Sequence, residues 1–146
     1  MCPYILMLAH TYTHTCTHTY TRVEHGLSIG ESTCQSKFWN APKGYGGNGV
    51  IEVSAMSRIA LERTSKAVDA IKLMGELAQE LGYYSCSYSG ANNDAYLGEG
   101  GEALTVVDKD EAWMFHILPD DTGTSAIWVA QRVPDGHVSI CFIPLR

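Results

Sequence analysis

Residues 103–118 read ALTVVDKDEAWMFHIL, and this stretch decides the fold. Two runs rich in β-branched and aromatic residues, at 103–108 and 112–118, flank the charged residues 109–111, which is typical of two antiparallel strands joined by a turn. A third strand is predicted at 125–133. The turn signal at 134–136 (Pro-Asp-Gly) predicts a fourth strand over 137–143. The C-terminal part of the chain is therefore predicted to be a meander of strands.

Upstream of the meander, the hydrophobic period changes to that of helices. Residues 50–62 predict a helix, with Val53, Met56, Ile59 and Ala60 on one face. A second helix is predicted to start at a Thr64 or Ser65 cap and to end at Gly82. Its apolar stripe consists of Val68, Ile71, Met74, Leu77 and Leu81. With a short strand within 24–33 and a loop over 38–49, the pattern predicts a layered α+β domain.

The first residues have a different character from the rest of the chain. From His10 to Thr21, Thr occupies every odd position and His, Tyr or Cys every even one. The period of two suits a β-strand, and His10, His14 and His18 are spaced as a helical metal tract would be. A translated (AC) dinucleotide repeat accounts for the pattern better, because it encodes alternating Thr and His. We therefore expect residues 1–23 to be a repeat-derived, disordered segment.

The composition excludes several classes of protein. The chain has 146 residues, 45% hydrophobic and 18% charged, as in an ordinary globular domain. A net charge of −6 disfavours nucleic-acid binding, and no apolar run approaches the roughly 20 residues of a membrane span. The composition and the scattered cysteines do not indicate a cellular compartment. The cysteines form no C-x-x-C pair, so a zinc finger is not predicted; they are Cys2, Cys16, Cys34, Cys86 and Cys141.

Several ordered motifs resemble one enzyme family. Residues 24–34 (EHGLSIGESTC), 98–105 (GEGGEALT), 111–113 (EAW) and 128–138 (WVAQRVPDGHV) are similar to segments of the dipeptidase family that contains bacterial dipeptidase A and the secernins. The helix around residues 60–78 is similar to another block of that family. The resemblance covers residues 24–139, so we expect 24–139 to be a partial dipeptidase domain and 140–146 to be a non-family end.

The resemblance implies a fold and a mechanism. Members of this family have an αββα sandwich of the N-terminal-nucleophile hydrolases, with two antiparallel sheets between helical layers. Their nucleophile is a cysteine at the mature N-terminus, whose α-amino group acts as the general base. The implied substrates are dipeptides, and no metal or organic cofactor is implied.

The chain departs from the family where the nucleophile is expected. Val23 stands where the family has Asn, and the strand that carries the nucleophilic cysteine lies further upstream in complete relatives. We therefore expect the nucleophile segment to be missing from this chain. Cys2 is a weak candidate, because Pro3 hinders removal of Met1. Cys34 is internal and has no α-amino group of its own to use as a base.

Three further residues are candidates for contacts with substrate or with the oxyanion. Ser32 and Thr33 end the strand that brings an oxyanion-stabilising group to the site in related hydrolases, although hydroxyls at a strand end also cap their neighbours. Arg132 can hold a substrate carboxylate in a bidentate pair, or it can be a solvated strand residue. The sequence predicts no metal partners for His116 and His137, and it predicts a loop position for Glu102.

Two functions remain open on the sequence. The first is a cysteine-type dipeptidase that cleaves dipeptides by acyl transfer. The alternative is a catalytically inactive fragment, or a non-enzymatic binding remnant of the same fold. The two differ in whether an N-terminal cysteine is present on a family-like strand.

Overall fold

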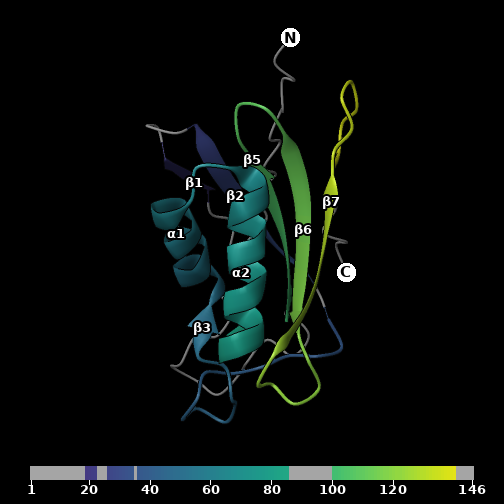
Figure 1. Ribbon diagram of the computed structural model, residues 1–146. Helices are drawn as coiled ribbons and strands as arrows, with labels where there is room; N and C mark the ends of the chain where they lie inside the picture. The colour runs from purple at the N-terminus through teal and green to yellow at the C-terminus, as the bar shows by residue number, and fades with distance from the viewer. Residues whose placement is uncertain (1–18, 23–25, 35, 86–99, 141–146) are drawn as a thin grey trace.

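The computed structural model describes residues 19–22, 26–34, 36–85 and 100–140. A five-stranded sheet and two helices make up most of this part of the chain (Figure 1). The elements, in chain order, are β1 (Thr19–Arg22), β2 (Leu27–Cys34), β3 (Ile51–Glu52), α1 (Val53–Arg63), α2 (Ala67–Leu81), β4 (Tyr83–Tyr84), β5 (Gly101–Val107), β6 (Ala112–Pro119) and β7 (Ala126–Arg132).

The large sheet has the strand order β1-β2-β5-β6-β7, and every neighbouring pair in it is antiparallel. The meander predicted for the three strands β5 to β7 is confirmed. The predicted fourth strand is wrong over 137–140, and its remaining residues lie outside the described part of the chain. The His137 N–H donates to the Pro134 carbonyl at 3.1 Å, and Gly136 takes a φ of 77°. Residues 137–140 follow this turn and form no strand in the described part of the chain.

The end of the Thr-rich segment lies at one edge of the sheet. Thr19–Arg22 forms β1, although the sequence analysis assigned residues 1–23 to a disordered segment. Its backbone pairs with β2, from Thr19 opposite Gly30 to Arg22 opposite Leu27. Thr is β-branched and suits a strand, and β2 offers an edge with backbone groups to pair. Residues 1–18 lie outside the described part of the chain.

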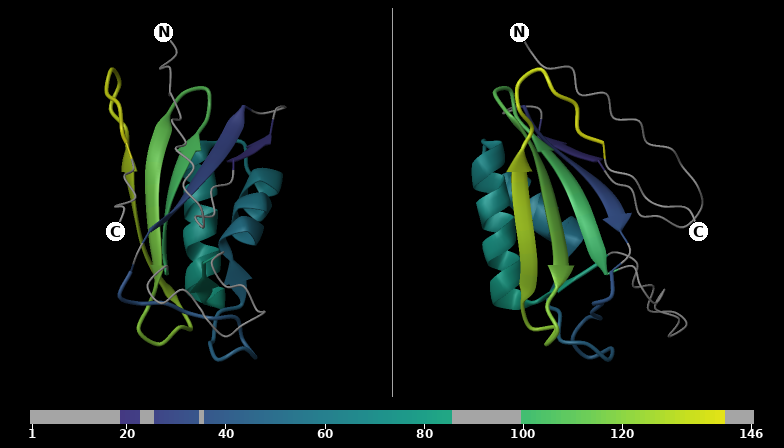
Figure 2. Two further views of the ribbon diagram at one scale, coloured as in Figure 1. Left: turned by 180° about the vertical axis from the view of Figure 1, so that it is seen from behind. Right: turned by 90° about the vertical axis from the view of Figure 1, so that its right-hand side faces the viewer.

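Both helices cover the same face of the sheet (Figure 2), which confirms the α+β class. Alternate residues of the strands point into the layer between sheet and helices, as the two-residue period requires. The buried core there includes Leu27, Ile29, Val53, Met56, Ala60, Met74, Leu104, Val106, Phe115 and Ile117. One sheet with helices on one face is compatible with half of an αββα sandwich.

The first helix begins later than its apolar period suggested. Val50 and Ile51 donate backbone hydrogen bonds to the carbonyl of Gly82, and Ile51–Glu52 pairs in parallel with Tyr83–Tyr84. The end of α2 therefore draws these residues into the short strand β3, and α1 starts at Val53. Its predicted face is buried at Val53, Met56 and Ala60.

The second helix presents small residues to the sheet. Its buried residues are Ala67, Ala70, Ile71, Met74, Gly75 and Ala78, whereas the flanking Leu77 and Leu81 are only partly buried. Gly75 lies directly against the indole ring of Trp128 on β7, where an added Cβ would be 2.3 Å from Cε2. The face of α2 that packs on the sheet therefore differs from the predicted apolar stripe: it is richer in small side chains, which let the helix approach the sheet closely.

The start of α2 is capped from a distance. Neither of the predicted caps acts there: Thr64 instead ends α1, where its hydroxyl donates to the Ala60 carbonyl at 2.9 Å. The N-cap residue Lys66 makes no capping bond with its side chain. The first helical N–H, that of Ala67, donates to Oδ2 of Asp108 at 2.7 Å. A carboxylate from the turn between β5 and β6 therefore caps the helix.

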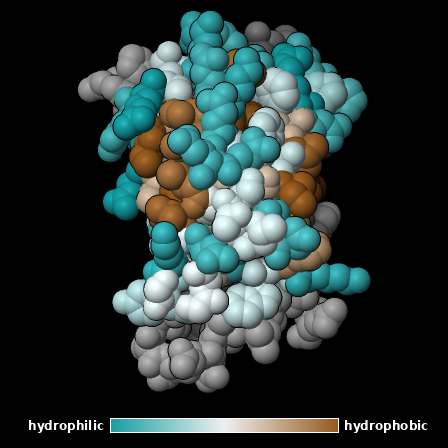
Figure 3. Space-filling view, turned by 60° about the horizontal axis from the view of Figure 1, so that its bottom comes forward, coloured by the Kyte–Doolittle hydropathy of each residue, from teal (hydrophilic) through white to brown (hydrophobic). Residues whose placement is uncertain are grey.

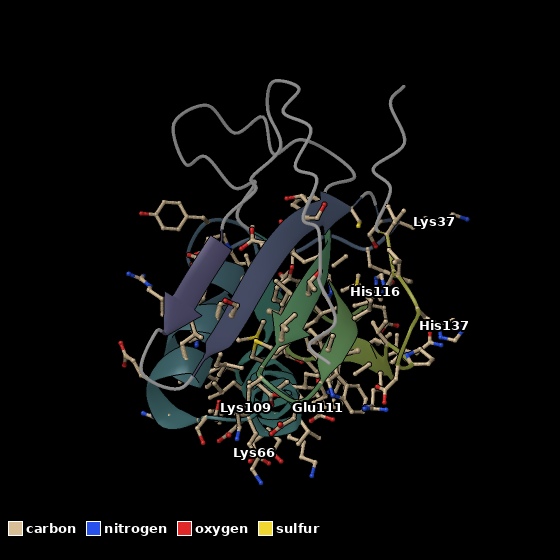
Figure 4. All side chains as sticks on the ribbon, turned by 90° about the horizontal axis from the view of Figure 1, so that it is seen from above. Lys37, Lys66, Lys109, Glu111, His116 and His137 are labelled. Atoms are coloured by element: carbon tan, nitrogen blue, oxygen red, sulfur yellow. The ribbon has the colours of Figure 1, made fainter. Side chains whose placement is uncertain are left out.

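Asp108 also closes its own turn. Its Oδ1 accepts the backbone N–H groups of Asp110 at 2.8 Å and Glu111 at 2.9 Å. Partial burial acts to raise the pKa of Asp108, but these hydrogen bonds, that of Ala67 and the charge of Lys109 outweigh it, so the pKa is lowered. Lys109 and Glu111 lie beside Lys66 when the molecule is viewed from above (Figure 4). One carboxylate thus joins the helix layer to the sheet.

Replacing Asp108 with alanine is expected to lower the free energy of unfolding by about 1 kcal/mol at pH 7, which is typical of a lost cap. The pKa of Asp108 in the folded protein lies below the unfolded value of about 3.9. The stabilisation by the Asp108 carboxylate is therefore fully present above about pH 3.9. It is lost as the pH falls through the folded pKa. Urea unfolding between pH 7 and pH 2.5 measures this, with Asp110→Ala as the exposed control. If the difference in free energy of unfolding between Asp108→Ala and the parent protein were the same at pH 2.5 as at pH 7, the capping role of Asp108 would be contradicted.

Candidate functional site

A cavity of about 310 Å³ opens at the end of the sheet where β2 and β6 finish. It lies between two loops, residues 37–48 and 120–123. The space-filling view with this end turned forward shows mostly polar and neutral surface between separate apolar patches (Figure 3). The volume is at the lower limit of small-ligand sites, about 300 Å³. The lining residues are Lys37, Phe38, Trp39, Asn40, Ala41, Gly46, Gly47, Asn48, Asp120, Asp121, Thr122 and Gly123.

Asn40 holds the two loops in place. Its Nδ2 donates to the carbonyl oxygens of Tyr83 at 2.9 Å and Gly123 at 2.7 Å, and its Oδ1 accepts the Asn48 N–H at 3.2 Å. Asn48 adds a second link, because its Nδ2 donates to the Thr122 carbonyl at 3.0 Å. One amide side chain therefore joins the first loop, β4 and the second loop. These bonds fix both loops that line the cavity.

Two glycines allow this close approach. Gly123 has a φ of 69°, and a Cβ there would lie 2.7 Å from Oδ1 of Asn40. A Cβ on Gly100 would lie 2.1 Å from the carbonyl oxygen of Phe38. Gly100 belongs to the motif at 98–105. Because it has no side chain, it lets the first loop cross close to the start of β5.

The second loop is stabilised by its own aspartate. The Thr122 hydroxyl donates to Asp120 at 2.7 Å, and the Ser125 N–H donates to the same carboxylate at 3.2 Å. The Thr122 hydrogen bond lowers the pKa of Asp120 against a smaller opposing effect of burial, and backbone N–H groups of the loop add to the lowering. Asp120 is therefore a carboxylate that shapes the loop.

A buried polar cluster lies on the helix-facing side of the same end of the sheet. Thr33 pairs with Glu102 across β2 and β5, and Ser85 donates to Oε1 of Glu102 at 2.5 Å. Glu31 and Glu102 are only 3% and 1% exposed. The predicted loop position of Glu102 is therefore wrong: it is a strand residue whose side chain points into the layer below the helices.

Ser32 and Thr33 point to opposite faces of β2. Thr33 is 2% exposed and lies on the face of Leu27 and Ile29, which the helices cover. Ser32 is half-buried on the opposite face, and its carbonyl accepts a weak bond from the Cys34 thiol at 3.7 Å. The two hydroxyls therefore serve different surroundings, and of the two only Ser32 faces away from the helices.

Arg132 lies far from these hydroxyls. The strand pairing places Arg132 opposite Trp113, Trp113 opposite Val106, and Val106 opposite Ile29. Ile29 and Thr33 are separated along β2 by about 13 Å, at about 3.3 Å per residue. The side chain of Arg132 is 44% exposed and forms ion pairs with Glu111 at 3.5 Å and Asp135 at 3.2 Å. The guanidinium, one of the candidate groups for a substrate carboxylate, is thus paired with two carboxylates of the protein.

The other candidates are placed as follows. Cys2 lies outside the described residues, and Cys34 is a half-buried residue at the end of β2. His116 points from the open face of β6 to solvent, and His137 follows the turn after β7 (Figure 4). Within the described ranges, no three His, Cys, Asp or Glu side chains gather as metal ligands. Over the same ranges, neither helix is long and apolar enough to span a bilayer.

Replacing Asn40 with alanine is expected to lower the free energy of unfolding by about 1–2 kcal/mol, since three hydrogen bonds are lost in a half-exposed place that water can reach. The loops should separate, so limited proteolysis within 41–49 and 120–124 should become faster. Asn48→Ala removes one link and is the milder comparison. Protease resistance of the Asn40 variant equal to that of the parent protein would contradict the role given to Asn40.

The comparisons with known proteins give one result. The model of peptidase family C69 matches residues 33–142, close to the range 24–139 that the motifs had indicated. No curated protein and no solved structure matches the chain. Because the match covers most of its length, the chain belongs to peptidase family C69.

The sequence analysis missed the residues that line the cavity. Lys37, Trp39, Asn40 and Asp121 belong to stretches predicted only as loops or left without assignment. The available signal was the density of Gly, Asn and Asp in two loops at the same end of a meander. Loops that end neighbouring strands meet at one edge of a sheet, which is a common place for ligand sites.

Proposed function

We propose that this protein is a dipeptidase of the cysteine type, in which an N-terminal cysteine of the complete enzyme attacks the peptide carbonyl. The match to a peptidase family over residues 33–142 is the observation that carries the proposal. A cavity of about 310 Å³, with polar and aromatic walls, supports a small peptide as the substrate. In this proposal the domain is one half of an N-terminal-nucleophile hydrolase sandwich.

The proposed chemistry has two steps. The α-amino group of the cysteine takes the thiol proton, and the thiolate attacks the carbonyl carbon to give a tetrahedral oxyanion. The oxyanion collapses to a thioester as the C–N bond breaks, and the amine leaves with the proton. Water then hydrolyses the thioester, which releases the first residue of the dipeptide as a free amino acid and regenerates the thiol.

Among the predicted oxyanion donors, the geometry favours Ser32. The side chain of Thr33 is buried under the helices, where it pairs across the strands with Glu102. Ser32 lies on the face that the helices leave uncovered. In the proposed mechanism Thr33 therefore has a structural role, and Ser32 is the group that approaches the substrate.

A dipeptidase assay on the product of the natural gene tests the proposal. Cleavage of a dipeptide panel should be measured by chromatography of the released amino acids. The expected activity is abolished by iodoacetamide and survives EDTA, and N-terminal sequencing of the active protein begins with cysteine. Cys34→Ala should retain activity. Turnover that survives alkylation, or an active product whose N-terminus is not cysteine, would overturn the mechanism.

The alternative is a binding domain without catalysis. It is favoured by the fact that none of the residues lining the cavity is a cysteine. Saturable dipeptide binding with no release of amino acids, in a preparation with its natural termini, would establish this alternative in place of the dipeptidase.

A further inference from the structure

The cavity carries two opposite charges that the fold itself does not use. Lys37 and Asp121 both line it and are both exposed. Within the described ranges, neither side chain takes part in a hydrogen bond or ion pair, whereas the neighbouring Asp120 is engaged by Thr122 and Ser125. An ammonium and a carboxylate that serve no structural purpose are therefore free to meet a ligand.

The remaining walls define what kind of ligand fits. Phe38 and Trp39 are 44% and 46% exposed, so each offers part of an aromatic ring at the cavity. The two aspartates disfavour phosphates and other polyanions. The loops are held by Asn40, so the charges sit on a framework that needs little reorganisation. Lys37 lines the cavity, and its side chain extends outward from the ribbon at the margin of the molecule (Figure 4).

The geometry points to Asp121 and Lys37 as the groups that recognise the two free termini of a short zwitterionic peptide. Asp121 attracts the terminal ammonium, Lys37 attracts the terminal carboxylate, and the aromatic rings contact the side chains between them. This inference rests on the proposed function and deepens it, because it assigns to these two residues the selection of unblocked dipeptides. Peptides with an acetylated N-terminus or an amidated C-terminus lose one of the two attractions.

Binding of glycyl-leucine to the full chain tests the inference. Tryptophan emission reports it, because Trp39 lines the cavity while Trp113 and Trp128 pack against the core. N-acetyl-glycyl-leucine and glycyl-leucinamide are the matched probes with one terminus blocked. Since exposed charge pairs contribute roughly 0.5–1 kcal/mol, each blocked peptide should bind about twofold to fivefold more weakly at low salt.

Two variants assign each charge to one terminus. Lys37→Met should bind glycyl-leucine and its amide equally, and Asp121→Asn should no longer distinguish glycyl-leucine from its acetylated form. Lys43→Met, in the same loop but outside the cavity lining, and Asp110→Asn, in the turn between β5 and β6, should discriminate as the parent protein does. Circular dichroism checks that all four variants fold, which is expected because these side chains are exposed.

The outcomes separate this inference from the proposed function. Equal affinity of the parent protein for free and blocked peptides, or unchanged discrimination in both cavity variants, overturns the role of Lys37 and Asp121. If dipeptides are cleaved but the KM responds to neither substitution, the recognition assignment fails while the dipeptidase proposal stands. If the discrimination follows the two charges but no hydrolysis occurs, the recognition assignment stands and the enzyme proposal fails.

Discussion

Replacing Phe115 with alanine is expected to lower the free energy of unfolding by about 3–5 kcal/mol, which is typical of removing a buried aromatic ring. Phe115 is 0% exposed and lies in β6, between Leu104 of β5 and Ala130 of β7. Its ring packs against that of Trp128 with centroids 5.5 Å apart. Domains have a total stability of about 5–15 kcal/mol. The loss would therefore remove a large part of the total stability.

Urea unfolding followed by circular dichroism measures this effect. Val129→Ala is the matched control, because Val129 is also in the meander but is 61% exposed, and its replacement should change stability by less than about 0.5 kcal/mol. If Phe115→Ala cost no more than Val129→Ala, the core could not lie between the sheet and α2.

Replacing Gly75 with alanine is expected to destabilise the protein by about 1–3 kcal/mol, the usual cost of overpacking. In an isolated helix the same change would stabilise by about 1 kcal/mol. Here the new Cβ would lie 2.3 Å from Cε2 and 2.6 Å from Nε1 of Trp128. The indole ring also packs against the ring of Phe115, with centroids 5.5 Å apart, and this contact restricts its movement. The steric effect therefore outweighs the gain in helix propensity.

A double-mutant cycle identifies the cause. In a Trp128→Leu background the ring is gone, so Gly75→Ala should cost much less or become favourable. Glu76→Ala, at the next and exposed position of α2, should change stability by less than about 0.5 kcal/mol. An equal cost of Gly75→Ala in both backgrounds would mean that the contact with Trp128 is not the reason.

The local features of the fold could be predicted because their signals are local. The apolar runs around Val106 and Phe115 have the two-residue period of strands, and the helical period around Met56 and Met74 is equally clear. The start of α2 could not be predicted, because its cap is Asp108, which is close in space but distant in sequence. Such a partner becomes visible only after the strands are paired.

The candidate site was harder to predict for the same reason. Ser32, Thr33 and Arg132 were selected from motifs, but strand alternation separates Ser32 from Thr33 and the sheet separates both from Arg132. The cavity depends on the side chain of Asn40, which contacts β4 and the second loop through two carbonyl groups. No periodicity in the sequence marks an asparagine that makes such long-range contacts.

The pairing of β1 with β2 has a consequence for variation of the gene. β1 is the end of a tract in which Thr recurs every two residues, and a strand also repeats every two residues. A shift of the tract by two residues therefore presents the same Thr pattern to β2, and the register is weakly specified. Alleles that gain or lose whole Thr-His dipeptides should keep this edge pairing. We expect the tract to be polymorphic in length among individuals, without a matching change in the stability of the protein.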